Sequence, residues 1–369
     1  MANQISLYSK FRPFQLDDIV GQSNTVETLK QAAIKKSFSH AYLMAGNHGC
    51  GKTSTARILA ALMECENTKD GKVCGECRAC RAIHIGAAAD VIEIDGASNS
   101  GVDNIKSLID AAQWSPQELQ RKVYIIDEFH RLTGPAESAL LKILEEPPSY
   151  VSFILCTTEI NKILPTILSR CQRFNFGKIS SKDISQRLTF IAQSEKINID
   201  TGSINIIAKL GRGSMRDAIG YLEQIGTVAA GKNITEAHVQ KYFGVSDRVG
   251  ILNIVKSIID SNIALILDQV NDMIMASSDC RQVMYEISDV FRNIMVLKAQ
   301  KGDSKLIDLP DSEIEDLKKL GESLKITQIL KLAHLFADVE KKMSFNINER
   351  WIMEATLINC VASLRKENV

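Results

Sequence analysis

Residues 40–63, "HAYLMAGNHGCGKTSTARILAALM", carry the clearest structural pattern in the first half of the chain. An apolar run that reads as a β-strand enters a glycine-rich loop, and a helical pattern follows the loop directly. The loop, residues 46–53, matches G-x4-G-K-[ST], the pattern of a P-loop. Backbone N–H groups of such a loop turn toward phosphate oxygens, and the start of the helix adds the positive end of its dipole. We therefore expect a nucleotide site between this strand and this helix.

The whole loop and the residue after it are candidate nucleotide-binding residues: Gly46, Asn47, His48, Gly49, Cys50, Gly51, Lys52, Thr53 and Ser54. In this pattern the lysine reaches the β- and γ-phosphates, and the threonine hydroxyl binds Mg²⁺. The alternative is a glycine-rich turn that matches by chance, and the strand–loop–helix context argues against it.

Around the loop, from residue 39 to about residue 176, strand-like and helix-like segments alternate. The predicted strands are "HAYLMAG", "ADVIEID", "KVYIIDE" and "SFILCTT", and the predicted helices include "VDNIKSLIDAAQ" and "ESALLKILEE". This rhythm predicts a parallel α/β sheet covered on both faces. Helical patterns then continue to the end of the chain. We expect three domains: an α/β nucleotide-binding domain at 1–178, a small helical domain at 179–243 and an all-α domain at 244–369.

Composition limits the remaining possibilities. The chain has 369 residues, with 44 basic and 44 acidic side chains that cancel, so net charge gives no argument for nucleic-acid binding. Its apolar runs are too short to cross a bilayer, and its N-terminus lacks the apolar region of a secretory signal. Nine cysteines, an odd number, also argue against a disulfide framework. The sequence therefore predicts a cytoplasmic protein with no membrane partner.

A second acidic motif, "KVYIIDEFH", ends the strand predicted at residues 122–128. Ligands of open α/β sheets gather at the carboxyl ends of the strands. Asp127 fits the shell of a bound metal, and Glu128 fits the base that polarises an attacking water. Acids also end strands at the surface without any role, but the P-loop before this pair favours the functional interpretation. His130 is given no catalytic role, since a lone histidine here is more often structural or exposed to solvent.

Further polar residues follow in order along the chain. Thr157 and Thr158 end the strand "SFILCTT", Arg170 lies in "ILSRCQRF", and Arg216 lies in "GRGSMRDAIGYL". Each is unremarkable by itself, because threonine commonly ends strands and arginine is common on surfaces. Their order after the P-loop and the acidic pair favours a role at the nucleotide.

Four cysteines are inserted between the P-loop helix and the strand "ADVIEID". Cys65, Cys74, Cys77 and Cys80 have the spacing C-x8-C-x2-C-x2-C. Four thiolates fit a tetrahedral structural Zn²⁺ site. An iron–sulfur cluster is the rival, because C-x2-C-x2-C also begins ferredoxin-like motifs. The spacing predicts a metal site at about residues 64–82 and leaves the choice of metal open.

Together these motifs resemble those of the AAA+ clamp-loader ATPases. "YSKFRPFQLDDIVGQ" at 8–22, the P-loop, "DEFH", "CTTE", "LSRC" and "GSMRDA" occur in the order typical of that family. The four-cysteine insertion and "EIDGASNSGVDNI" at 93–105 are similar to the gamma/tau family of bacterial DNA polymerase III. The resemblance is dense over residues 1–245 and general over the rest. It implies a helical lid at 179–243, an oligomerisation collar at 244–369, and zinc in the cysteine cluster.

The resemblance also implies roles for single residues. It places four residues beside adenine: Tyr8, Arg12, Pro13 and Val20. It assigns the phosphates and Mg²⁺ to Lys52, Thr53 and Asp127, and the attacking water to Glu128. One strand-end threonine, Thr157 or Thr158, would sense the γ-phosphate. Arg216 would be a second sensor that reaches from the lid to its own nucleotide, and Arg170 would be an arginine finger that completes a neighbouring subunit's site.

The function implied is that of an ATP-hydrolysing motor subunit that opens a sliding clamp and loads it onto primed DNA during chromosomal replication. ATP, Mg²⁺ and structural Zn²⁺ would be its cofactors. Its partners would be delta and delta-prime type subunits, copies of itself, the clamp and primed DNA, with polymerase and helicase only if a longer tau-type C-terminus exists. Alternatives are another AAA+ DNA-processing ATPase, such as a helicase loader or branch-migration motor, and a non-hydrolysing nucleotide-binding replication scaffold.

Overall fold

The computed structural model describes residues 6–229, 231–244, 248–275, 279–300, 306–307, 309, 311–343 and 348–365. The chain divides into two compact units, Met1–Asn233 and Ile234–Val369. The division falls ten residues before the boundary expected at 243/244. Gly244, at the expected boundary, ends the helix at residues 236–243 in the left-handed conformation, with φ of 60°. The break in the sequence pattern therefore marks the end of this helix and not the division between the two compact units. The division into three domains stays a prediction.

The first unit contains a five-stranded sheet with strand order β2-β3-β4-β1-β5. All neighbouring strands run parallel. The strands are β1 (Ala41–Gly46), β2 (Val91–Asp95), β3 (Lys122–Asp127), β4 (Val151–Thr157) and β5 (Gln172–Phe176). The three inner strands are buried over almost their whole length, as strands covered on both faces must be. The predicted α/β fold class is confirmed. The sequence did not predict β5, a short edge strand whose buried residues are Phe174 and Phe176.

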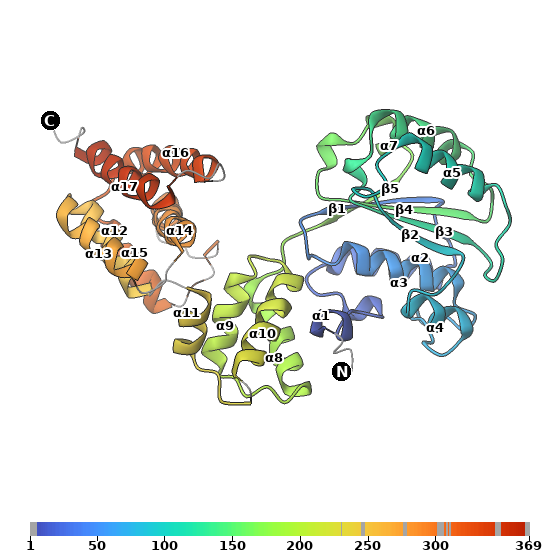
Figure 1. The fold of residues 1–369 in the computed structure, drawn as a ribbon, viewed down its shortest axis with the longest axis horizontal. Coiled ribbons are helices and arrows are strands. Elements are labelled where there is room, and N and C mark those ends of the chain that lie inside the picture. Colours follow the sequence, from blue (N-terminus) through green and yellow to red (C-terminus); the bar gives the residue numbers. More distant parts are fainter. Residues whose placement is uncertain are drawn as a thin grey trace. The chain divides into compact units, whose positions relative to one another are not determined.

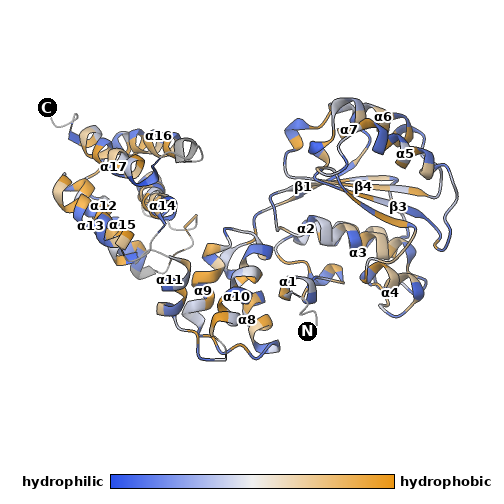
Figure 2. Cartoon of the chain, viewed as in Figure 1, coloured by the Kyte–Doolittle hydropathy of each residue, from blue (hydrophilic) through white to orange (hydrophobic). Residues whose placement is uncertain are grey.

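Helices cover both faces of this sheet (Figure 1). One face carries α2 (Ser23–Ile34) and α3 (Lys52–Glu64), with α4 (Arg78–His84) packed on α3. The other face carries α5 (Val102–Ala112), α6 (Gly134–Glu145) and α7 (Pro165–Leu168). Alternate side chains of each strand enter the two cores, so Tyr42 faces the first core and Leu43 the second. Apolar strands therefore lie between amphipathic helices (Figure 2).

Three further helices complete the first unit: α8 (Ser181–Ser194), α9 (Thr201–Leu210) and α10 (Met215–Ala229). Capping residues fix the starts of the first two, since the Ser180 side chain accepts from the Asp183 N–H and the Asp200 side chain from the Ser203 N–H. The short α1 (Leu7–Lys10) packs against α10. Segments from opposite ends of this unit therefore meet.

The named elements of the second unit, within its described residues, are all helices. They are α11 (Glu236–Phe243), α12 (Arg248–Ile259), α13 (Ile263–Met275), α14 (Cys280–Ala299), α15 (Asp311–Gly321), α16 (Ile326–Met343) and α17 (Glu349–Arg365). One apolar core joins α12 to α17, with Ile254, Val290 and Leu357 among its buried residues. Across the described ranges of both units, every helix is too short or too polar to span a bilayer.

Candidate nucleotide-binding site

The P-loop connects β1 to α3 and is shaped by close contacts at its glycines. A Cβ on Gly46 would lie 2.4 Å from the carbonyl oxygen of Phe176. Gly49 has φ of +67°, and a Cβ there would lie 1.9 Å from Oγ of Ser214. The Lys52 ammonium donates to the carbonyls of Gly46 and Asn47, both at 2.8 Å. The lysine is therefore held inside the loop, at the place where phosphate oxygens would bind.

Thr53 and Asp127, the two predicted magnesium ligands, lie in contact beneath the loop. The Thr53 hydroxyl donates to Asp127 Oδ2 at 2.7 Å, although these residues come from α3 and β3. The other carboxylate oxygen of Asp127 accepts from the Glu128 N–H at 2.9 Å. A hydroxyl and a carboxylate at a nucleotide site are oxygen ligands of the kind that Mg²⁺ takes.

Glu128 begins the turn after β3 and has a left-handed backbone, with φ of 47°. Its Oε2 accepts from the Thr158 hydroxyl at 3.2 Å, and its Oε1 lies 3.4 Å from Nδ1 of the exposed His48. Thr157 is buried, and its hydroxyl bonds to Nδ1 of His130 rather than to this carboxylate. Side chains of a strand point to alternate faces, so the structure separates the two candidate sensors and leaves Thr158 beside Glu128.

Helix α10, which lies in the predicted lid, contacts the P-loop directly. The Met215 N–H at its start donates to the carbonyl of Gly49 at 3.0 Å. The guanidinium carbon of the next residue, Arg216, lies 4.9 Å from the ring centroid of Tyr8, and that of Arg12 lies 5.1 Å from it. Such cation–π contacts contribute about 0.5–1 kcal/mol at exposed sites and more when desolvated. Arg216 is therefore held beside the loop by the N-terminal segment.

These elements enclose one cleft within the first unit. The predicted residues that line it are Tyr8, Arg12, Pro13, Val20, His48, Gly49, Cys50, Gly51, Lys52, Thr53, Ser54, Asp127, Glu128 and Arg216. Gly46, Asn47, Thr157, Thr158 and Arg170 are not among its lining residues. Arg170 follows α7, where its guanidinium pairs with Glu145 and donates to the Thr166 carbonyl. An arginine finger would act at the nucleotide site of a neighbouring subunit, so Arg170 is not expected to line the cleft of its own chain.

Sequence reasoning missed other lining residues, namely Phe11, Asp18, Ile19, Ile179, Arg187, Met215 and Ile219. Some of them carried a signal. Asp18 and Ile19 directly precede the predicted residue Val20 in the sequence. Ile219 lies three residues after the predicted Arg216 on α10, so the two side chains lie on the same face of that helix.

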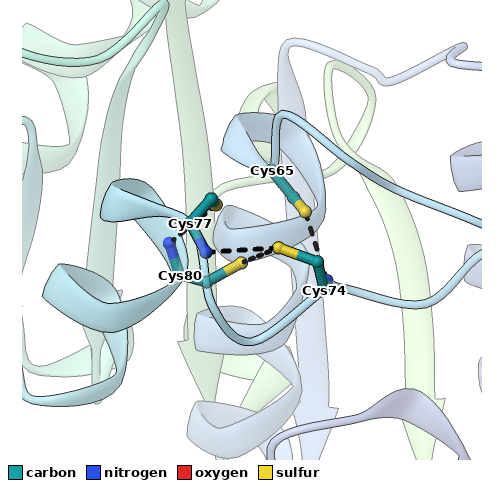
Figure 3. Close-up of side chains that lie close together, drawn as sticks. All are labelled: Cys65, Cys74, Cys77 and Cys80. Carbon is teal, nitrogen blue, oxygen red and sulfur yellow. Dashed lines mark hydrogen bonds between the residues drawn. The ribbon is translucent and has the colours of Figure 1, made fainter.

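The four cysteines of the insertion converge (Figure 3). Their sulfurs all lie within 4.8 Å of one another, and sulfurs around a tetrahedral Zn²⁺ are about 3.8 Å apart when each bond is about 2.3 Å. Backbone N–H groups donate to three of the sulfurs, from Cys74 to Cys65, from Cys77 to Cys74 and from Cys80 to Cys77. Several hydrogen bonds, that of the Cys77 N–H first, lower the pKa of Cys74 to about 6, whereas burial raises the pKa of Cys80. A sulfur that favours the thiolate form fits a metal-binding role.

The cysteine module also contacts the segment that leads into the cleft. The side-chain amide of Gln15 donates to the Val73 carbonyl at 2.9 Å and accepts from its N–H at 3.2 Å. Lys72 pairs with Asp17 at 2.8 Å, and the Phe14 and His84 rings meet edge to face at 4.7 Å. The segment 14–17 is therefore fixed against residues 72–84, and the cleft residues Asp18 to Val20 follow it directly.

The parallel sheet, the P-loop and the helical lid that share one cleft define a P-loop nucleotide-binding protein of the AAA+ class. Three family models match the chain. "DNA polymerase III, delta subunit" matches residues 21–180, "DNA polymerase III clamp loader subunit, ATPase lid domain" residues 183–233, and "DNA polymerase III subunits gamma and tau domain III" residues 234–367. The chain belongs to the family of gamma and tau subunits of DNA polymerase III.

Curated relatives carry the same name. The tau subunit of Bacillus subtilis is 36% identical over 360 residues, which are 96% of this chain and 62% of the relative. The gamma/tau subunit of Mycoplasma pneumoniae is 44% identical over 237 residues, 64% of this chain and 35% of the relative. The tau subunit of Escherichia coli is 31% identical over 360 residues, which are 96% of this chain and 55% of the relative. The chain thus spans less than two thirds of the length of these relatives. A solved structure titled as the RuvB Holliday junction branch migration motor of Thermotoga maritima has a TM-score of 0.48 and 21% identity, covering 68% of this chain and 79% of that one.

Proposed function

We propose that this protein is the ATP-hydrolysing motor subunit of a bacterial clamp loader, which opens a sliding clamp and loads it onto primed DNA. The observation that carries the proposal is the arrangement around the P-loop. Thr53 contacts Asp127, Thr158 contacts Glu128, and α10 of the lid bonds to the loop itself. A scaffold that only bound nucleotide would need no carboxylate placed for water beside the metal ligands.

Each group has a distinct task in this proposal. The loop N–H groups and Lys52 bind the phosphates, while Thr53 and Asp127 hold Mg²⁺, which neutralises charge as the γ-phosphoryl group leaves. Glu128 orients and polarises the attacking water. Thr158, rather than the buried Thr157, is the candidate sensor of the γ-phosphate. Arg216 senses the same nucleotide from the lid.

Arg170 would complete the site of a neighbouring subunit. A trans arginine contributes roughly 10³–10⁵ in rate to phosphoryl transfer, or about 4–7 kcal/mol of barrier. The partners proposed are delta and delta-prime type subunits and copies of this chain, with the all-α domain at 244–369 as the collar between them. The four cysteines would hold a structural Zn²⁺, and the protein would act in the cytoplasm, where the chromosome is replicated.

The test is steady-state ATP hydrolysis by the protein assembled with its delta-type partners, with and without clamp and primed DNA. Strong stimulation that requires both ligands is expected. Turnover that ignores the clamp but rises with forked or junction DNA would favour a helicase loader or branch-migration motor instead.

A variant separates a motor from a scaffold. Glu128→Gln should keep ATP binding and lose hydrolysis, because the amide cannot act as a base. The exposed Glu146, which lies outside the cleft lining, offers Glu146→Gln as a matched control with unchanged turnover. Hydrolysis that survives Glu128→Gln would show that the base is another group.

A further inference from the structure

His130 lies behind the cleft, in the short 3-10 turn Phe129–Arg131 that follows β3. Only 3% of its side chain is exposed. The turn is fixed on both sides of the histidine, since Phe129 is fully buried and the Arg131 N–H donates to the Glu128 carbonyl at 2.8 Å. The imidazole is therefore confined between the ends of β3 and β4.

Both ring nitrogens have partners there. Nδ1 lies 3.1 Å from the Thr157 hydroxyl and 3.4 Å from Oε2 of Glu128, while Nε2 lies 3.3 Å from Oε1 of Glu159. The Thr157 hydroxyl in turn accepts from the Glu159 N–H at 3.0 Å. One buried ring thus connects the carboxylate that follows β3 to Thr157, the last residue of β4, and to Glu159 two residues beyond it.

We infer that His130 is a positioning residue for Glu128, an inference that rests on the proposed role of Glu128 as the base. The geometry points to this because His130 is the buried one of the three side chains that meet this carboxylate, although its Nδ1, at 3.4 Å, lies farther from Oε2 than the Thr158 hydroxyl does. His48 is 77% exposed, and the Thr158 hydroxyl is one neutral donor at 3.2 Å. A buried ring loses little freedom in making its contact, whereas an exposed pair contributes about 0–1 kcal/mol. In this inference His130 fixes the position of the Glu128 carboxylate. A displacement of Thr157 or Glu159 would move the ring and, through it, that carboxylate.

The plainer interpretation is a buried histidine whose hydrogen bonds only stabilise the fold. The two differ in what His130→Asn does to catalysis. A 1 Å displacement of a catalytic group can cost roughly a hundredfold in rate, so we expect kcat to fall about 10- to 100-fold. ATP affinity and KM should stay within about twofold, because the P-loop, Lys52 and Thr53 do not contact His130. A merely structural residue would instead lower affinity and kcat together, or neither.

The experiment measures kcat, KM and ATP affinity of the assembled loader carrying His130→Asn or His130→Gln. His40, which is exposed and precedes β1, supplies His40→Asn as a matched control with unchanged values. Glu159→Gln perturbs the partner of Nε2 from an exposed position, so it tests the same link without opening the core, and a severalfold loss in kcat is expected.

A double variant makes the test specific. If His130 acts through Glu128, adding His130→Asn to Glu128→Gln should change the residual turnover little, because residues that act as a unit are not additive. Full additivity would overturn the inference, and so would wild-type kcat in His130→Asn. A wild-type loader without ATP turnover would overturn the proposed function and this inference together, whereas normal turnover with an unaffected His130→Asn overturns only the latter.

Discussion

Gly49→Ala should separate the lid from the P-loop. The Gly49 carbonyl accepts from the Met215 N–H at 3.0 Å, and a Cβ on Gly49 would lie 1.9 Å from Oγ and 2.9 Å from Cβ of Ser214. Contacts of a Cβ below 3.0 Å are essentially never observed. The Ser214 side chain and the start of α10 would therefore have to shift, and Arg216, whose Cβ would lie 3.2 Å from the new methyl group, would shift with them.

The size of the effect follows from two contributions. The left-handed backbone at φ of +67° costs an alanine about 1–2 kcal/mol. The displacement of Arg216 and the loop adds a loss of roughly 10- to 100-fold in catalytic efficiency. Gly86→Ala is the matched control for the first contribution, because Gly86 has φ of +71° and a Cβ added to it would meet no atom within 4 Å.

The assay is titration of each variant with a fluorescent ATP analogue, followed by steady-state hydrolysis in the assembled loader. Gly49→Ala should lose affinity and turnover, and Gly86→Ala should lose only thermal stability. Ser214→Gly removes both clashing atoms, so the double variant Gly49→Ala/Ser214→Gly should recover most of the lost affinity. If Gly49→Ala had the same ATP affinity and turnover as Gly86→Ala, the contact between α10 and the P-loop would not contribute to ATP binding or hydrolysis.

Three further predictions concern other parts of the first unit. Arg170→Ala should leave the ATP affinity of the isolated chain unchanged and lower turnover of the assembled loader by about 10³-fold or more; unchanged assembled turnover would exclude a trans finger. Cys74→Ser should abolish the zinc found by metal analysis of the wild-type protein and lower its melting temperature, whereas iron in the wild type would refute the zinc assignment. Burial opposes ionisation of Asp90, but the N–H groups of residues 117–119 outweigh it and hold its pKa below the ordinary value. Its stabilising effect is therefore complete above a pH of about 4 and lost as pH falls through the lowered pKa, so acid unfolding monitored by circular dichroism should begin at a higher pH in Asp90→Ala than in the wild type.

The sequence predicted the parts of the molecule that depend on local patterns. The P-loop, the inner strands and the acidic pair each have a signature within a few residues, and all were found. The edge strand β5 was missed because its residues are mostly polar and only Phe174 and Phe176 enter the core. Edge strands need few apolar residues, so their pattern is weak.

Contacts between distant segments could not be predicted in the same way. The choice between Thr157 and Thr158 depends on which side chain faces Glu128, which is set by the pairing of β3 with β4. His130 was given no role because a lone histidine after a strand is more often structural or exposed to solvent. Its partners come from three positions in the chain, and only the fold brings them within 3.4 Å.

The contacts between the cysteine module and the segment 14–17 connect the proposed metal site to the cleft around the P-loop. Gln15 and Val73 exchange two hydrogen bonds across 58 positions of sequence, so the N-terminal wall of the cleft rests on residues that a bound metal would order. Coupling of this kind is reciprocal: whatever free energy the metal adds to nucleotide binding, the nucleotide adds to metal binding. ATP would then slow the loss of zinc to a chelator, and the metal content of the protein would report on its nucleotide state.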